Sequence, residues 1–303
     1  MKPQKPFYRF LLGAAIALVV LLVGFAWIGA SSLNWGSTRE EMSRALPADE
    51  LVPDPSLIWN HALTINAPAE AVYPWLVQIG DSRAAFYSIT FIENAFCAMS
   101  GECRYVNADR IHPEWQTPAK GVQGIIMDTM VIQDYQPGQY VLATTTDKLP
   151  LKWTWLWYVE PVNASSSRLT VRHRIAFPAD APQGLINAIF TTGFVMERGM
   201  MLGIQARAQG VVPAPLEEPL GAVIWLLVFA MGVACAARFV RVVDGYHALG
   251  VGLEAVVVLF VLTYLQPPMI LRFVLLLMVA AGLYIAFKRA AFRQRVPAHA
   301  KAD

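Results

Sequence analysis

Hydrophobic residues form four long runs in this 303-residue chain, one near the amino terminus and three near the carboxyl terminus. A bilayer core about 30 Å thick is crossed by roughly 20 apolar residues in a helix that rises about 1.5 Å per residue. We therefore predict four transmembrane helices. The first lies within residues 1–32, where Phe10–Ala30 carries no charge, and the others lie within 212–303, at about 220–240, 247–265 and 269–287.

The first run could also be a cleaved signal peptide, because Lys2, Lys5 and Arg9 precede it and small residues follow it at 29–31. A secretory apolar core is usually only about 7 to 15 residues long, so this run favours an uncleaved anchor. In the third run, Glu254 either pairs with a nearby arginine or is protonated against a neighbouring helix, unless it has a functional role.

The pattern changes between the first and second runs. Turn-forming residues and prolines at 33–56 predict an extended tether, and residues 57–211 predict one folded domain. Ile58–Asn66 alternates polar and apolar residues, as a strand does, and Pro68 opens a helix. Helical spacing also marks Phe86–Met99 and the long stretch Gln183–Gln209.

Four β-prone runs lie between these helices, separated by turn residues. They predict antiparallel strands at Gly124–Ile132, Tyr140–Thr145, Leu151–Val162 and Arg168–Phe177. The third has apolar side chains on both faces and should be covered twice. An antiparallel sheet that curls around one long helix leaves an interior that side chains do not fill, so we predict a lined pocket.

Composition and charge argue against a nucleic-acid-binding protein and against a small disulfide-built domain. With 56% hydrophobic residues, 15% charged residues and a net charge of +2, the chain lacks the concentrated basic face of a nucleic-acid binder. Its three cysteines are too few for a disulfide-built scaffold. Basic residues flank the four runs on one side, which predicts cytoplasmic termini and places residues 31–215 in the periplasm or outside the cell.

Several motifs resemble the START-like or SRPBCC superfamily, whose domains have the helix-grip fold. The resemblance covers roughly residues 34–210, in a membrane-anchored bacterial branch. Its motifs are Ala67–Gly80, Phe86-Tyr87-Ser88, Glu93-Asn94, Asn107–Ile111, Pro113–Gln116 and Met196–Ile204. Asp81–Ala85 departs from this branch, because many relatives are rich in glycine there. The resemblance implies an α+β helix-grip domain beside the four membrane helices of an inner-membrane protein, and a cavity for a hydrophobic ligand.

Candidate ligand-binding residues follow from the predicted cavity. Most are aromatic residues and methionines, and His173 and Glu197 are the polar members. The full set is Phe86, Tyr87, Trp115, Trp155, His173, Met196, Glu197 and Met200.

The sequence gives weaker support for catalytic acid/base residues than for ligand-binding residues. His112 lies beside Asp109 and Glu114, which more often form a hydrogen-bonded brace than a catalytic site. His173 shares an apolar face, where a lone histidine is usually structural. An oxidising compartment would allow Cys97 and Cys103 to form a disulfide, the alternative being two free thiols. The spacing of the cysteines and histidines indicates no metal site, and no cofactor is expected.

We therefore predict a membrane-anchored binding or transport protein that holds a lipid or another apolar small molecule. One alternative is an enzyme of the cyclase or dehydratase type, using His112, Asp109 or His173. The other is an accessory subunit without a ligand, whose membrane helices recruit a membrane-protein partner. The expected partners are thus the bilayer and an apolar molecule, and not nucleic acid.

Overall fold

The computed structural model describes residues 6–98, 105–212, 214, 216–241 and 246–295. The chain divides into two units, one formed by Ile28–Ala214 and the other by Met1–Trp27 together with Pro215–Asp303. The long helix α1 (Pro6–Ser32) contributes to both, because its last turn belongs to the first unit.

The second unit consists of apolar helices. Besides α1 it contains α6 (Glu217–Arg241), α7 (Tyr246–Phe260) and α8 (Met269–Arg295), and α7 continues into a π-helical turn, η4 (Val261–Leu265). Four helices are long and apolar enough to cross a membrane. Between η4 and α8 the chain turns at Gln266, which adopts a left-handed conformation. In α7 the Glu254 carboxylate lies against Gly282 of α8.

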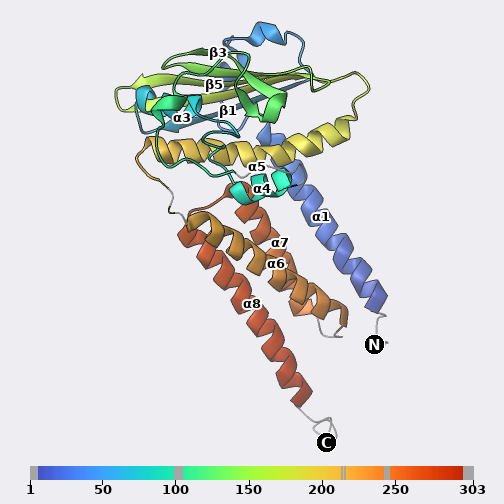
Figure 1. Ribbon diagram of the computed structural model, residues 1–303. Coiled ribbons are helices and arrows are strands. Elements are labelled where there is room, and N and C mark those ends of the chain that lie inside the picture. The colour runs from blue at the N-terminus through green and yellow to red at the C-terminus, as the bar shows by residue number, and fades with distance from the viewer. Residues whose placement is uncertain (1–5, 99–104, 213, 215, 242–245, 296–303) are drawn as a thin grey trace, which may run out of the picture. The chain divides into compact units, whose positions relative to one another are not determined.

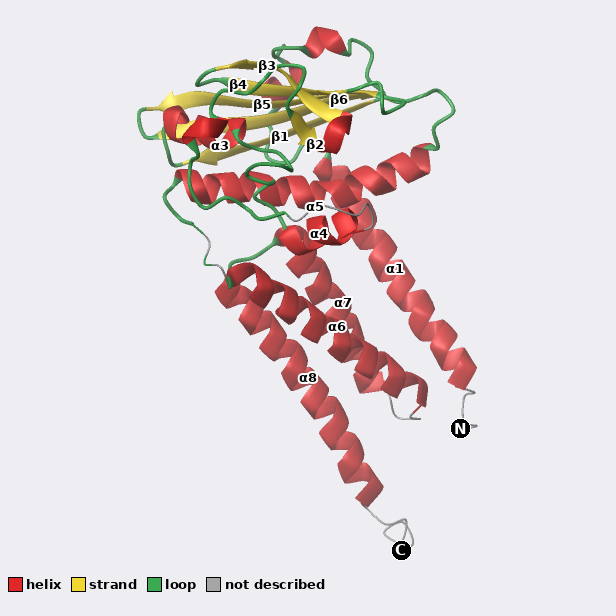
Figure 2. Ribbon diagram, viewed as in Figure 1, coloured by secondary structure: helices red, strands yellow, loops and turns green. Residues whose placement is uncertain are grey.

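The first unit is built on a six-stranded antiparallel sheet in the order β1-β6-β5-β4-β3-β2. Figure 2 shows the strands as one layer, with the long helix α5 lying along it. The strands are β1 (Leu57–Ile65), β2 (Gly124–Ile126), β3 (Met130–Gln136), β4 (Tyr140–Thr145), β5 (Lys152–Asn163) and β6 (Ser166–Ala176).

Two helices cover what we call the inner face of this sheet, the face that carries Trp155, Trp157 and His173. They are α3 (Ala69–Val77) and α5 (Gln183–Ala208), which runs along the sheet (Figure 1). Strand side chains alternate between faces, so every second residue of β5 and β6 enters the core under these helices. A six-stranded antiparallel sheet with one long helix along it fits the predicted helix-grip fold.

The predicted strand Gly124–Ile132 is wrong as a single element. The chain turns at η3 (Met127–Thr129), so its two halves belong to the neighbouring antiparallel strands β2 and β3. The Thr129 hydroxyl donates to the Ile126 carbonyl at 2.7 Å and closes this turn. A local bond of this kind competes with strand pairing, which explains why the β-prone run is interrupted.

The predicted helix Phe86–Met99 begins later than expected, at Thr90, as α4 (Thr90–Ala98); Met99 lies outside the described residues. Ala85 and Tyr87 have positive φ angles of 53° and 55°, which a helix cannot contain. The Tyr87 hydroxyl donates to the Trp75 carbonyl and accepts from Gln78, so the side chain is held in the core and fixes this conformation.

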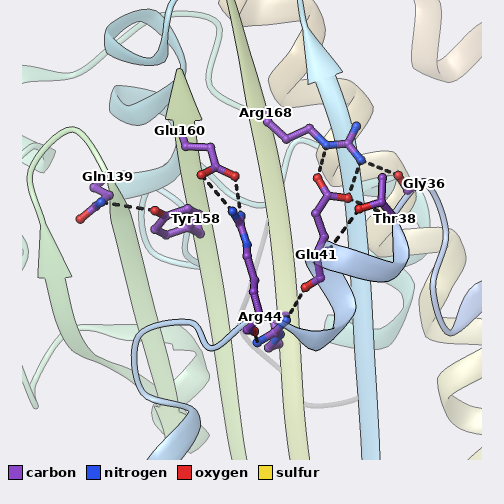
Figure 3. A network of polar contacts seen from close by, with 9 residues as sticks. Gly36, Thr38, Glu41, Arg44, Gln139, Tyr158, Glu160 and Arg168 are labelled. Carbon is purple, nitrogen blue, oxygen red and sulfur yellow. Dashed lines mark hydrogen bonds and ion pairs between the residues drawn. The ribbon is translucent and has the colours of Figure 1, made fainter. Parts of the chain in front are cut away.

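Residues 33–56 do not form the extended tether that we predicted. They contain α2 (Arg39–Ser43) and η1 (Asp49–Leu51), and they pack on the outer face of the sheet, opposite α5. Figure 3 shows Glu41 paired with Arg168 of β6, and Arg44 paired with Glu160 of β5. We call residues 33–56 the arm.

One buried arginine of β6 fastens the arm most extensively. Arg172 is 3% exposed, and it donates to the Asp49 carboxylate, the Asn60 side chain and the backbone carbonyls of Glu41 and Arg44. The arm and Arg172 are more than 100 residues apart along the chain, so the local composition of the arm did not reveal these bonds and predicted a loose segment instead.

Candidate functional site

A buried polar network crosses the inner face beneath α5. Glu197 of α5 contacts His61 of β1 through one carboxylate oxygen and His173 of β6 through the other. All three side chains are at most 5% exposed. The remaining ring nitrogens are engaged as well, because His61 Nε2 bonds the Ser32 carbonyl and the Trp153 indole N–H donates to His173 Nδ1 at 2.9 Å.

These contacts determine where the protons of the network lie. An indole nitrogen only donates, so His173 Nδ1 must accept, and its Nε2 carries the hydrogen that Glu197 receives. A carbonyl only accepts, so His61 Nε2 must carry a hydrogen. One further proton lies between His61 Nδ1 and Glu197. Overall, the three side chains carry no net charge, and every polar atom in them has a partner.

Burial alone would raise the pKa of Glu197, but the adjacent His173 and His61 lower it to about 2. The hydrogen-bond pattern gives the same direction. A second proton on the carboxylate would need an acceptor that the network lacks, since both oxygens already receive hydrogens. The network therefore joins β1, β6, α5 and the last turn of α1 in one neutral, fully bonded group.

An aromatic cluster lies between this network and the end of the sheet. Phe190 of α5 makes edge-to-face contacts with three rings, those of Trp59, Trp153 and Phe177, at centroid distances of 4.9 to 5.9 Å. Such contacts are favourable beyond the burial of apolar area. Trp153 therefore belongs both to the aromatic cluster, where its ring packs on Phe190, and to the polar network, where its N–H donates to His173.

The cluster borders an open groove of about 680 Å³. The groove is lined by residues 145–147 and 149–152, around the turn between β4 and β5, and by residues 176–178, at the end of β6. Phe177 lines the groove and also contacts Phe190, so the apolar wall continues into the aromatic cluster. This volume is within the range of small-molecule sites, although the groove is open rather than enclosed.

The predicted ligand-binding residues lie mostly in packed interior. Tyr87, Trp155 and Met200 are 3 to 4% exposed, so these three side chains are buried between the sheet and the helices. Trp155 stacks on His173 with a centroid distance of 5.4 Å. The Met196 carbonyl accepts the Ser88 hydroxyl, and Phe86 packs on Tyr105, so these residues brace the domain away from the groove.

The acid/base candidates divide between two places. His112 stacks on Trp115 at 4.0 Å and contacts Glu114 at 3.1 Å at the surface, where the Glu114 side chain is 62% exposed. The structure does not bring this loop to His173 or Glu197. Both carboxylate oxygens of Glu197 bond histidines. Both nitrogens of His173 are engaged with protein groups, which leaves neither free to move a substrate proton.

The remaining predictions concern cysteines and metals. Cys97 belongs to α4, but Cys103 lies outside the described residues, so the disulfide stays a prediction. In the part of the chain that the structure describes, no group of three histidine, cysteine or acidic side chains is arranged to hold a metal ion.

Sequence reasoning missed His61, Phe177 and Phe190. His61 was within reach, because the alternation of the strand that contains it places Trp59, His61 and Leu63 on one face. A histidine between two apolar inward residues gives the same signal that drew attention to His173. Phe177 and Phe190 gave no comparable signal, because their contact depends on how the connection between β6 and α5 turns.

No protein-family model matches the sequence, and no curated protein matches it. Several solved structures resemble about half of the chain. A conserved protein from Geobacillus kaustophilus is 13% identical over 51% of this chain and 96% of its own, with a TM-score of 0.30. A START superfamily protein from Mycobacterium smegmatis is 12% identical over 50% and 97%, with a TM-score of 0.31. The aromatase/cyclase Zhui from Streptomyces sp. R1128 is 13% identical over 52% and 96%, with a TM-score of 0.27. Similarities at this level do not assign the chain to a family.

Proposed function

We propose that this chain is a membrane-anchored binding protein that holds a lipid or another apolar small molecule in its sheet-and-helix unit. The observation that carries the proposal is the groove whose wall, at Phe177, continues into the aromatic cluster around Phe190. Burial of apolar area in such a site supplies about 25 cal/mol per Å². The open side of the groove leaves part of a bound molecule exposed, which suits a carrier that must also release it.

A polar contact that orients the ligand is available close by. The Trp155 indole N–H is buried and has no acceptor among the described residues. Its ring stacks on that of Trp153 at 6.2 Å, and Trp153 belongs to the aromatic cluster. A buried donor without a partner costs about 1–3 kcal/mol. A carbonyl or ester oxygen that enters past Trp153 would remove this cost.

The four apolar helices support anchoring of this unit at a membrane. Basic residues at the amino terminus, at Arg238 and Arg241, and after Phe287 support cytoplasmic termini, with residues 31–215 on the other side. In this arrangement the groove works outside the cytoplasm, next to a supply of lipid.

The test is binding of a neutral fluorescent probe, N-phenyl-1-naphthylamine, together with native mass spectrometry of the detergent-extracted protein. Phe177→Ala removes the shared wall, and Ala176→Trp fills the groove. Each should weaken probe binding at least tenfold, about 1.4 kcal/mol, and reduce retained lipid. Val162→Trp, at a side chain 57% exposed in the β5–β6 hairpin, is the matched control. Equal affinity in all four proteins, with no retained lipid, would refute the proposal.

A further inference from the structure

One carboxylate lies near the middle of an apolar helix. The stretch formed by α7 and η4 runs from Tyr246 to Leu265, and Glu254 has eight of its residues on one side and eleven on the other. At about 1.5 Å per residue, Glu254 is therefore within about 3 Å of the midpoint. If this helix crosses a bilayer, a charged side chain at such a depth is costly unless a cation or a hydrogen-bonding group faces it.

The Glu254 carboxylate has no such partner in its own chain. Within the residues that the structure describes, no hydrogen bond or ion pair engages it. Arg238 of α6 is directed to α8 instead, where its guanidinium carbon lies 4.5 Å from the centre of the Phe287 ring. Glu254 is only partly buried. Its carboxylate is thus neither paired nor enclosed by the helices beside it.

This carboxylate lies over a gap in the side-chain surface of α8. Gly282 is the residue next to it, and an added Cβ there would lie 3.3 Å from the Glu254 oxygen Oε2. On the same side of α8, Met278 and Ile285 are 50% and 49% exposed, four residues before Gly282 and three after it. Two exposed apolar side chains therefore flank a position without a side chain. We call Glu254, Met278, Gly282 and Ile285 the notch.

The occupant that the notch favours is a helix of another membrane protein. Glycine allows membrane helices to approach closely, and a carboxylate among lipid tails is stabilised by a cation at its own depth. A second copy of this chain offers no such cation, because each basic residue of the four apolar stretches is among the first or last four residues of its stretch. These residues are Arg9, Arg238, Arg241, Arg272 and Lys288.

We propose that the notch binds a membrane-spanning helix of a different protein that carries a lysine or an arginine at mid-membrane depth. The basic side chain pairs with the Glu254 carboxylate, and the residues around it pack against Met278 and Ile285. The chain is then one component of a membrane complex in addition to binding a ligand. This inference rests on the membrane anchoring proposed above and does not involve the groove.

The experiment uses dansyl-labelled model helices of about 25 leucine and alanine residues, long enough to span a bilayer, with arginine or leucine at the central position. A central arginine has the same depth in either orientation of the helix. Binding to the full chain in phosphatidylcholine vesicles is followed by energy transfer from its tryptophans. Glu254→Gln removes the charge at nearly constant size, and Glu217→Gln, in the first turn of α6, is the matched control. The thermal midpoints of both variants are first compared with that of the wild type.

We expect the arginine helix to bind the wild type about tenfold more tightly than the leucine helix. The preference should fall below about twofold in Glu254→Gln and persist in Glu217→Gln. Equal affinity of the two helices for a wild type that resists extraction by alkaline carbonate would overturn the notch and leave the anchoring intact. A wild type that self-associates through Glu254 and ignores the arginine helix would overturn it too, because a second copy would then cover the notch. Release by carbonate would instead refute the anchoring, whereas the groove variants test the ligand site separately.

Discussion

Replacement of Glu197 by glutamine should preserve the buried network, whereas replacement by alanine should break it. Glutamine can donate its amide to His61 Nδ1 and accept from His173 Nε2, because His61 becomes neutral while still donating to the Ser32 carbonyl. Every bond of the network then survives without the shared proton. Alanine leaves both histidines with a buried nitrogen that has no partner.

The size of the alanine effect follows from the burial of the network. Removal of one partner of a buried ionic pair costs roughly 3–5 kcal/mol. The histidines lower the pKa of Glu197 from 4.5 to about 2 against the opposing effect of burial, which agrees in direction with a destabilising loss of this carboxylate. In a unit of this size, such a loss lowers the melting temperature by about 10 °C. The glutamine variant should lose less than about 1 kcal/mol.

The two proteins should also differ in acid. Because the folded pKa of Glu197 is below its ordinary value, its stabilisation is complete above about pH 4.5 and is lost as the pH falls towards 2. The wild type should therefore lose melting temperature between pH 5 and 3 more steeply than Glu197→Gln. Glu41, whose pKa Arg168 also lowers to about 2, titrates equally in both proteins, so the comparison isolates Glu197.

The assay is thermal unfolding of the detergent-solubilised chain, followed by tryptophan fluorescence at several pH values. The buried tryptophans beside the network report the unfolding of this unit. If the glutamine variant were as unstable as the alanine variant at pH 7, the proton assignment would be wrong. If all three proteins melted alike, the network would not contribute to stability.

Two further results are expected from the packing. Arg172→Ala should free the arm and cost roughly 3–5 kcal/mol, seen as faster limited proteolysis within residues 37–56, whereas Lys120→Ala, at a side chain 53% exposed, should cost less than about 1 kcal/mol. Gly203→Ala should destabilise strongly, because its Cβ would lie 2.1 Å from the Tyr87 carbonyl oxygen, while Gly184→Ala, in the same helix with open space around it, should be neutral or stabilising in thermal unfolding. Equal melting temperatures for the two glycine variants would contradict this packing.

The elements of this fold were predictable because their signals are local. Uncharged runs of about 20 residues identified the apolar helices, and the alternation in β5 and β6 placed Trp155 and His173 on one face. The errors occurred where a few local bonds override a propensity. The Thr129 hydroxyl interrupts a β-prone run, and the left-handed Ala85 and Tyr87 delay a helix.

The candidate site was less predictable because it is assembled over long distances along the chain. His61 and Glu197 are 136 residues apart, and their contact depends on the register of β1 against β6 and on the position of α5. The groove depends on the shapes of two connections, around residues 145–152 and 176–178. A pattern of residue types contains no information on either shape, so the sequence did not indicate this groove.

The edges of the sheet show which surfaces remain for partners. Edge strands offer unpaired backbone groups that recruit other chains unless they are covered. At one edge, β1 is covered by the arm, since Asn60 and Ala62 donate their backbone N–H groups to the carbonyls of Leu33 and Trp35. At the other edge, β2 is only three residues long. Among the described residues, neither edge of the sheet therefore presents a long free strand to which another chain could pair.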